Sequence, residues 1–284
     1  MTRSPAWPSL CAAVALAAPP AAQQATFSSR LEAVRVDVAV TERGRPVAGL
    51  GADDFELFDN GVRQTVQLIV SDEIPIDLVM ALDISDSVTG ERLEHLRRGS
   101  QAALDALTQE DRAALLTFTQ RVMLRVPLTG DTAAIAAALD RESLPGTTSM
   151  IDAAYAALAH ADAGRGRGLA IVLSDGVDTA SWLTADSVVE TARRMDAVLF
   201  GISAGTRRAA ALGELADATG GDVIRIASTA ELSVALRSLI DSFRQRYLLS
   251  FVPQGVARGG WHRLDVRAKR RGLSVKARAG YFGS

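Results

Sequence analysis

The chain has 284 residues with a formal net charge of −2, and 48% of its residues are hydrophobic and 23% are charged. These values are typical of a globular protein with a substantial core, and they exclude a fibrous, disordered or strongly cationic chain. A net charge this small gives the protein no overall electrostatic attraction to nucleic acid or to an anionic membrane surface.

Residues 1–22 have the layout of a secretory signal peptide. Arg3 precedes an apolar segment at 10–18, and small residues and prolines follow up to a cleavage point near Ala22. A disordered tail and lipidation of Cys11, the only cysteine, are the weaker alternatives. No later segment has 18 consecutive apolar residues, so we expect no transmembrane segment. The protein is therefore predicted to be exported, to a periplasm or out of the cell, with no cysteine after processing.

Residues 28–72 are predicted to form an N-terminal β-module. Valines alternate with other residues from 34 to 40, which is the period of a half-buried strand and leaves Arg35 and Asp37 on the opposite face. The Asp-Asn-Gly sequence at 59–61 is a strong signal for a β-hairpin.

Residues 74–246 alternate apolar segments with amphipathic helices, which predicts a Rossmann-like, doubly wound and mostly parallel sheet. Three apolar segments are typical of strands buried on both faces, and they span 74–83, 168–175 and 197–204. The segments 112–119 and 121–128 are close enough in sequence to form an antiparallel hairpin at one edge of this sheet.

Residues 247–284 return to β-strand patterns and form the predicted C-terminal β-segment. This segment and the N-terminal β-module are each too small to be stable alone. We therefore expect the two to pack together as an additional all-β subdomain.

Two apolar strands end in an aspartate, Asp83 in one case and Asp175 in the other. Ligands of parallel α/β sheets collect at the carboxyl ends of the strands, so neighbouring strands would bring the two carboxylates together. Two close carboxylates need a proton or a cation between them, and a hard divalent cation prefers oxygen ligands. Ser85 and Ser87 add hydroxyl oxygens, and the loop at 144–152 adds more. Helix capping and turn formation are the structural alternative for these residues.

The sequence Asp-Ile-Ser-Asp-Ser at 83–87 resembles the Asp-x-Ser-x-Ser signature of the von Willebrand factor type A (VWA) domain. That family carries a metal-ion-dependent adhesion site, abbreviated MIDAS. The resemblance implies five metal ligands, which are Asp83, Ser85, Ser87, Thr148 and Asp175. Thr148 is preferred over the alternative Thr147, because it lies four residues before Asp152 at the start of a predicted helix. Asp86 departs from the pattern, because a small uncharged residue is frequent there. The flanking β-segments are similar to exported VWA-related proteins of acidobacteria, so the resemblance extends over nearly all of the mature chain.

The function that this resemblance implies is binding without enzymatic turnover. The cation is expected to be Mg²⁺, with Mn²⁺ or Ca²⁺ as alternatives, and an Asp or Glu of a protein partner completes its coordination. We therefore expect an exported module for metal-dependent adhesion or protein–protein interaction, with no nucleic-acid partner.

Two other functions remain as alternatives. A strand-end aspartate with Mg²⁺ also occurs in hydrolases and phosphatases, but an aspartate-nucleophile phosphatase needs a second carboxylate where this chain has Ser85. The basic segment at 267–278 is able to bind a polyanion, although a solvated strand face is the favoured interpretation. Trp182 and Trp261 are candidate contact residues, with a role in the core as the favoured expectation.

Overall fold

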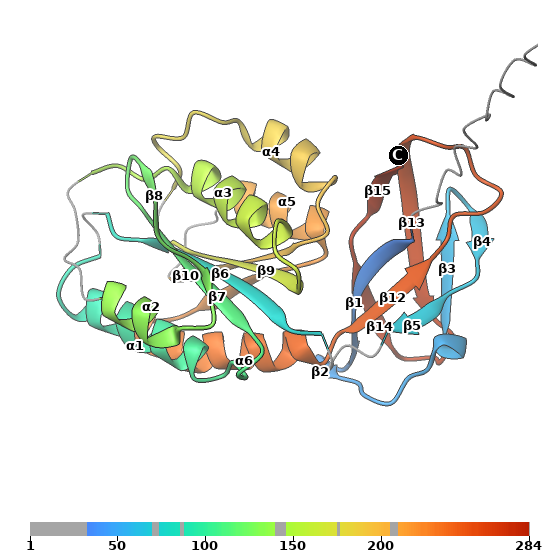
Figure 1. The fold of residues 1–284 in the computed structure, drawn as a ribbon, viewed down its shortest axis with the longest axis horizontal. Coiled ribbons are helices and arrows are strands. Elements are labelled where there is room, and N and C mark those ends of the chain that lie inside the picture. The colour runs from blue at the N-terminus through green and yellow to red at the C-terminus, as the bar shows by residue number, and fades with distance from the viewer. Residues whose placement is uncertain are drawn as a thin grey trace, which may run out of the picture. The chain divides into compact units, whose positions relative to one another are not determined.

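A six-stranded sheet forms the middle of the chain in the computed structural model, which describes residues 33–69, 74–85, 88–139, 146–174, 177–204 and 210–283 (Figure 1). The strand order is β11-β10-β9-β6-β7-β8, and all neighbours are parallel except β7 and β8. The strands are β6 (Ile76–Asp83), β7 (Arg112–Phe118), β8 (Val122–Thr129), β9 (Arg167–Leu173), β10 (Val198–Ala204) and β11 (Val223–Ile226). The mostly parallel sheet with one antiparallel edge hairpin is therefore confirmed.

Both faces of this sheet are covered by helices (Figure 1). Successive side chains of a strand point to opposite faces, so Leu78 and Met80 of β6 enter one core and Val79 and Ala81 enter the other. The first core is covered by α1 (Glu91–Leu104), α2 (Thr132–Ala138) and α6 (Leu232–Arg244). The second is covered by α3 (Met150–Asp162), α4 (Ala185–Ala192) and α5 (Ala210–Thr219). Among the described residues, no helix is long and apolar enough to cross a membrane.

Helix α6 packs closely against α1. Five apolar residues with the spacing of one helical stripe are all buried in α6, and they are Leu232, Leu236, Leu239, Ile240 and Phe243. Gly99 of α1 allows the close approach, because a Cβ at this position would lie 2.9 Å from the Cβ of Leu232. The end of α6 leads directly into the β-strands that follow.

The remaining strands form two antiparallel sheets around a separate apolar core. One sheet has the order β14-β1-β12-β5 with β2 beside β1, and the other has the order β15-β13-β3-β4. The N-terminal strands are β1 (Val34–Glu42), β2 (Arg45–Pro46), β3 (Phe55–Asp59), β4 (Val62–Gln64) and β5 (Gln67–Ile69). The C-terminal strands are β12 (Tyr247–Phe251), β13 (Gly260–Ala268), β14 (Ser274–Ala277) and β15 (Gly280–Gly283). Each sheet contains strands from both ends of the chain, so the predicted all-β subdomain is confirmed.

The hairpin at residues 59–61 has the predicted turn. Asp59 pairs with Val62, and the backbone φ angles are 47° at Asn60 and 83° at Gly61. Two successive positive φ angles are typical of the tight turns that match the twist of antiparallel strands. Asparagine and glycine tolerate this conformation best, which explains the sequence at this turn.

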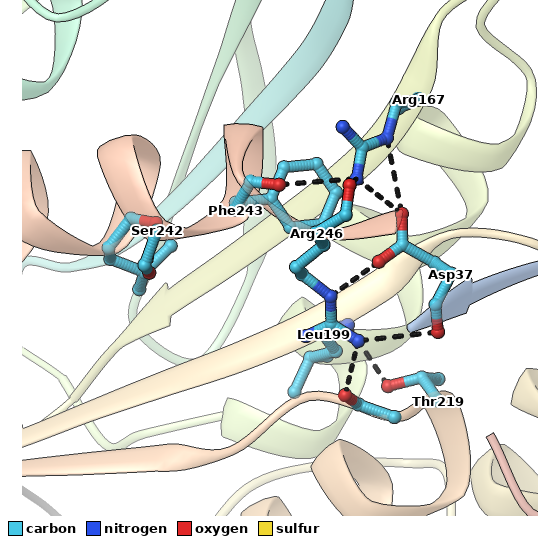
Figure 2. Close-up of polar contacts among 9 residues, drawn as sticks. Asp37, Arg167, Leu199, Thr219, Ser242, Phe243 and Arg246 are labelled. Carbon is cyan, nitrogen blue, oxygen red and sulfur yellow. Dashed lines mark hydrogen bonds and ion pairs between the residues drawn. The ribbon is translucent and has the colours of Figure 1, made fainter. Parts of the chain in front are cut away.

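Side chains on both faces of strand β1 make contacts within the protein. Val36 and Val38 are fully buried in the β-sandwich core, as the alternation predicts. Asp37, on the opposite face, accepts hydrogen bonds from Arg167 at the start of β9 and from Arg246 just after α6 (Figure 2). The Asp37 carboxylate is therefore buried against the α/β part of the chain.

Asp111 connects three segments of the α/β part. Its Oδ1 accepts a hydrogen bond from the backbone N–H of Ile76 at 2.7 Å, and its Oδ2 accepts from the backbone N–H of Thr108 at 2.7 Å. Oδ2 also accepts from Arg244 Nη2 at 2.6 Å. Burial tends to raise the pKa of Asp111, but the hydrogen bonds from Arg244, Ile76 and Thr108 outweigh it and hold the pKa below its usual value.

Replacing Asp111 with asparagine is expected to lower the free energy of unfolding at neutral pH by about 2–4 kcal/mol, because Arg244 loses its charged partner. A lowered native pKa means that the carboxylate stabilises the fold above about pH 4 and that this stabilisation disappears as the pH falls through the native pKa. Urea unfolding between pH 7 and pH 3 measures both effects. The difference between wild type and Asp111→Asn should shrink at the acidic end, whereas exposed Asp53→Asn should match wild type throughout. A difference that is constant with pH would contradict the assigned ionisation.

Candidate metal centre

Asp83 ends β6 at the carboxyl edge of the parallel sheet. Its neighbour β9 is paired so that Leu82 lies opposite Leu173, which places Ser174 beside Asp83. Ser174 Oγ donates a hydrogen bond to Asp83 Oδ2 at 2.8 Å, and the backbone N–H of Ser85 donates to Oδ1 at 3.0 Å. The side chain is buried, with 2% of its surface exposed. Asp83 is therefore held in one orientation at the edge of the sheet.

Backbone hydrogen bonds hold the described residues of the loop that follows β6. The backbone N–H of Ile84 donates to the carbonyl of Phe118 at the end of β7, at 3.0 Å. The backbone N–H of Val88 donates to the carbonyl of Ser85 at 2.8 Å. Ser85 is buried. Ser87 and Asp86 lie outside the described residues, so the predicted ligand role of Ser87 stays a prediction.

Thr148 reaches the same place from a third loop. The next residue, Ser149, donates from its Oγ and its backbone N–H to the carbonyl of Thr119, at 2.7 and 2.8 Å, which fixes this loop to the end of β7. As a result, Thr148 Oγ1 lies 3.4 Å from Ser85 Oγ. The structure thus brings together three of the five predicted ligands, which are Asp83, Ser85 and Thr148. Asp175, directly after Ser174, lies outside the described residues.

The oxygen atoms gathered here are those that a hard divalent cation requires. They comprise the carboxylate of Asp83 and the hydroxyls of Ser85, Thr148 and Ser174, all buried. Within the described ranges, no group of three or more His, Cys, Asp or Glu side chains is placed to hold a metal. Carboxylate and neutral oxygen ligands suit Mg²⁺, Mn²⁺ and Ca²⁺ better than softer metals. The donor set therefore fits the expected cation.

Ser174 is a site residue that the sequence interpretation did not identify. It orients Asp83 through its hydroxyl, and it also lines a cavity of about 40 Å³ beside that carboxylate. Arg92 of α1 lines the same cavity, which is otherwise mostly apolar. The serine directly precedes Asp175 in the second strand-end sequence, so its position in that motif was the available signal.

A second loop, residues 177–184, is bound to the start of α3 and to the loop of Thr148. Ser181 Oγ accepts hydrogen bonds from the backbone N–H groups of Ile151 and Asp152, both at 3.1 Å. The backbone N–H of Thr179 donates to the carbonyl of Thr148 at 2.9 Å. Serine is favoured for capping helix N-termini, although here it comes from a distant segment. The loop is therefore positioned by the same elements as the predicted metal ligand Thr148.

Trp182 projects from this loop, and 92% of its surface is exposed. The carboxylate of Asp152 accepts hydrogen bonds from the backbone N–H groups of Trp182 and Leu183, both at 3.0 Å, which fixes the backbone below the ring. Val177 in the same loop is also exposed. The expected core role of Trp182 is therefore wrong. Loop residues lack a periodic pattern, so burial at this position was not readable from the sequence.

Trp261 differs from Trp182 in its surroundings. Its ring lies edge-on to that of Phe282, with ring centroids 5.3 Å apart, and the guanidinium of Arg193 lies 5.2 Å from its centroid. Only 36% of the residue's surface is exposed, against 92% for Trp182. Trp261 is therefore mainly a packing residue.

The sequence matches the model of the von Willebrand factor type A domain over residues 77–239. This match covers more than half of the 284 residues, so the chain belongs to the VWA family. It includes all five residues expected to bind the metal. No curated protein matches the chain.

Several solved structures have the same fold. A von Willebrand factor type A protein from Catenulispora acidiphila has a TM-score of 0.56 and 15% identity, with 90% of this chain and 75% of that chain covered. Proximal thread matrix protein 1 from the mussel byssus, with a zinc-occupied MIDAS motif, has a TM-score of 0.55 and 18% identity over 65% of this chain and 49% of that one. The VWA-type domain of the pilus tip protein Mfa5 from Porphyromonas gingivalis has a TM-score of 0.50 and 13% identity over 65% and 98%. At such low sequence identities, these structural similarities show only that the proteins share a fold with this chain.

Proposed function

We propose that this protein is an exported adhesion or interaction module that binds a divalent cation and uses it to capture an acidic partner protein. The proposed ligands are Asp83, Ser85, Ser87, Thr148 and Asp175. The observation that supports the proposal best is that Thr148 meets Asp83 and Ser85 at one strand edge although it lies 63 residues after Ser85 in the sequence. Mg²⁺ is the proposed cation, with Mn²⁺ and Ca²⁺ as alternatives.

The donor set explains why the site favours binding over turnover. Serine and threonine hydroxyls are neutral, so they ligate a divalent cation without cancelling its charge. A cation held by few carboxylates keeps positive charge and an open coordination position. A glutamate or aspartate of a partner protein is a charged oxygen ligand for that position. Partner capture therefore depends on the metal.

The proposal is tested by affinity capture from the envelope fraction of the source cell, once with Mg²⁺ and once with EDTA. We expect a specific partner in the Mg²⁺ sample and its loss in EDTA. Equal recovery of the partner in both samples would show that its capture does not depend on the metal. Calorimetric titration of the purified mature chain with Mg²⁺ and Mn²⁺ is the independent check, and the absence of binding heat for both ions would refute the metal site.

Trp182 gives the partner a second point of contact. The loop of Trp182 is hydrogen-bonded to Thr148 and to the start of α3. These bonds fix the position of the exposed ring relative to the proposed metal ligand Thr148. Tryptophan is enriched among the residues that dominate binding energy at protein interfaces. We infer that the captured segment carries an apolar or aromatic side chain close to its acidic residue.

Replacing Trp182 with alanine is expected to weaken partner capture by at least about tenfold, the effect of losing one dominant interface residue. Cation affinity and thermal stability should stay at wild-type values, because the ring makes no contact in the core. Val234→Ala, which truncates another exposed apolar residue on α6, on the opposite face of the sheet from α3, is the control and should bind normally. Wild-type capture by Trp182→Ala would place the partner elsewhere on the surface.

The basic C-terminal segment is a weaker candidate for binding a polyanion, because three of its six basic side chains have acidic partners. Lys276 lies 3.0 Å from Asp217 and 3.4 Å from Asp222, and Arg267 lies 2.5 Å from Asp265. Arg278 is buried and bonded to Asp196. These ion pairs reduce the positive charge that the segment offers to a polyanion.

A further inference from the structure

Thr148, a proposed metal ligand, lies on a loop whose backbone is bound to the loop at 177–184. The backbone N–H of Thr148 donates a hydrogen bond to Thr179 Oγ1 at 3.1 Å. Its carbonyl accepts from the backbone N–H groups of Thr179 and Ala180, at 2.9 and 3.1 Å. Both backbone polar groups of Thr148 therefore have partners on two consecutive residues of one neighbouring loop.

The other side of Thr148 is fixed to a different segment. Ser149, the next residue, donates from its Oγ and its backbone N–H to the carbonyl of Thr119 at 2.7 and 2.8 Å. Thr148 is itself buried, with 8% of its surface exposed. Threonine is β-branched, so its χ1 angle is restricted and the position of its hydroxyl follows from the position of its backbone. The 3.4 Å distance between Thr148 Oγ1 and Ser85 Oγ therefore depends on both attachments.

The hydroxyl of Thr179 is the part of this attachment that depends on the residue type. Almost any residue at position 179 offers a backbone N–H to the carbonyl of Thr148, but only a side chain with an acceptor atom receives the N–H of Thr148. Thr179 is exposed, so packing in the core does not account for a threonine at this position. Buried backbone N–H groups in native proteins nearly always have an acceptor, and Thr179 Oγ1 is the acceptor for Thr148.

The loop at 177–184 has further attachments to the start of α3. Ser181 Oγ accepts from the backbone N–H groups of Ile151 and Asp152, both at 3.1 Å. Asp178 Oδ1 also accepts from the N–H of Ile151 at 3.1 Å. The position of the Thr179 hydroxyl therefore does not depend on the bond to Thr148 alone, and a well-held acceptor is able to fix the residue that binds to it.

We propose that Thr179 is a positioning residue of the metal site, whose hydroxyl holds Thr148 Oγ1 close enough to Ser85 for both side chains to share one cation. The inference rests on the proposed function, because it requires Thr148 to bind the cation. Thr179 acts through Thr148 and is not a ligand itself. Replacing a residue that orients a metal ligand typically lowers the affinity for the metal by about 10–100-fold. Since Thr148 is one of several ligands, the lower end of this range is expected.

Replacing Thr179 with valine preserves the shape of the side chain and removes its acceptor atom. We expect the affinity of the mature chain for Mg²⁺ and Mn²⁺ to fall by about tenfold, because Thr148 is held less tightly. Thr179→Ser keeps the hydroxyl and should retain an affinity close to that of the wild type. Calorimetric titration with each ion measures these affinities. An equal loss in the serine and valine variants would show that the hydroxyl is not responsible and would overturn the proposal.

Thr184→Val is the matched control, since Thr184 belongs to the same loop and is also exposed. Its Oγ1 accepts a hydrogen bond from the backbone N–H of Ser187 in α4, at 3.3 Å, and makes no bond to Thr148. Each valine variant removes one hydroxyl acceptor from a backbone N–H, so both should lower the thermal midpoint by a similar amount, roughly 2–4 °C. Only Thr179→Val should weaken cation binding. Equal losses of affinity in the two valine variants would indicate a general loosening of the loop and would overturn the proposal.

The wild type and Asp83→Asn separate this inference from the proposed function. If the wild type shows no binding heat with either ion, the metal site is refuted, and the role of Thr179 is refuted with it. If the wild type binds, Asp83→Asn does not bind and Thr179→Val binds with wild-type affinity, the metal site stands and only the role of Thr179 is overturned. Support for the proposal is a tenfold loss in Thr179→Val that neither Thr179→Ser nor Thr184→Val shares.

Discussion

Replacing Asp83 with alanine is expected to abolish binding of Mg²⁺ and Mn²⁺, with at least about a hundredfold loss of affinity. Asp83 is the one carboxylate that the described part of the site contributes, and neutral hydroxyls alone hold a divalent cation poorly. Its two oxygens are already oriented by Ser174 and by the backbone of Ser85, so the wild-type site needs little rearrangement to bind. Calorimetric titration of the mature protein measures the loss directly.

Removal of a buried carboxylate also affects the fold, so the experiment needs a variant that separates the two effects. Asp83→Asn keeps the size and one acceptor for Ser174 while it removes the negative charge. We expect near-wild-type circular dichroism for this variant and a loss of cation affinity close to that of Asp83→Ala. Asp53→Ala, which removes an exposed carboxylate far from the site, should bind the cation normally. Wild-type affinity in folded Asp83→Asn would disprove the assigned ligand.

Replacing Asp37 with asparagine is expected to lower the free energy of unfolding by about 3–5 kcal/mol, the usual effect of removing one partner of a buried ion pair. Asp37 is shared by Arg167 and Arg246, whose side chains are only 3% and 5% exposed. Without the carboxylate, two guanidinium groups remain buried with reduced compensation. Equilibrium unfolding in urea, monitored by circular dichroism, gives the difference from the shift of the midpoint.

The control for this variant is a second Asp–Arg pair in the same chain. Asp265 and Arg267 also form a close pair, but their side chains are 43% and 61% exposed. Exposed pairs contribute about 0–1 kcal/mol, so Asp265→Asn should be close to wild type. If the two substitutions had equal effects, the burial of the Asp37 pair would have no energetic consequence. The metal affinity of Asp37→Asn should remain at the wild-type value at temperatures where it is folded.

The strand and helix pattern was predictable because it depends on local periodicity. The apolar segment that ends at Asp83 is fully buried, as an unbroken apolar run predicts. The Asn60–Gly61 turn and the stripe of α6 were equally readable, since φ preferences and 3.6-residue spacing are properties of short segments. The same local signals located Asp83 and Ser85, because a strand end and the loop behind it are adjacent in sequence.

The ligand constellation was only partly predictable. Thr148 was assigned from the family resemblance, and its 3.4 Å approach to Ser85 requires a contact across 63 residues of sequence. Ser174 was missed although it directly precedes Asp175. Its role is to orient Asp83, and this role depends on which strand lies beside β6, which the sequence does not show. Trp182 was assigned the wrong environment, because the burial of a loop residue depends on what packs over the loop.

By itself, the sequence determined the two-part architecture and the strand ends, and it supplied the order of the proposed oxygen ligands, since each follows from residue types over a few positions. It also placed Asp37 on the polar face of β1. Only the tertiary structure decided that the Asp37 side chain is buried against Arg167 and Arg246, which lie 130 and 209 residues further along the chain. The physical reason is that periodicity sets which side chains share a face, whereas partner identity depends on the packing of segments far apart in sequence.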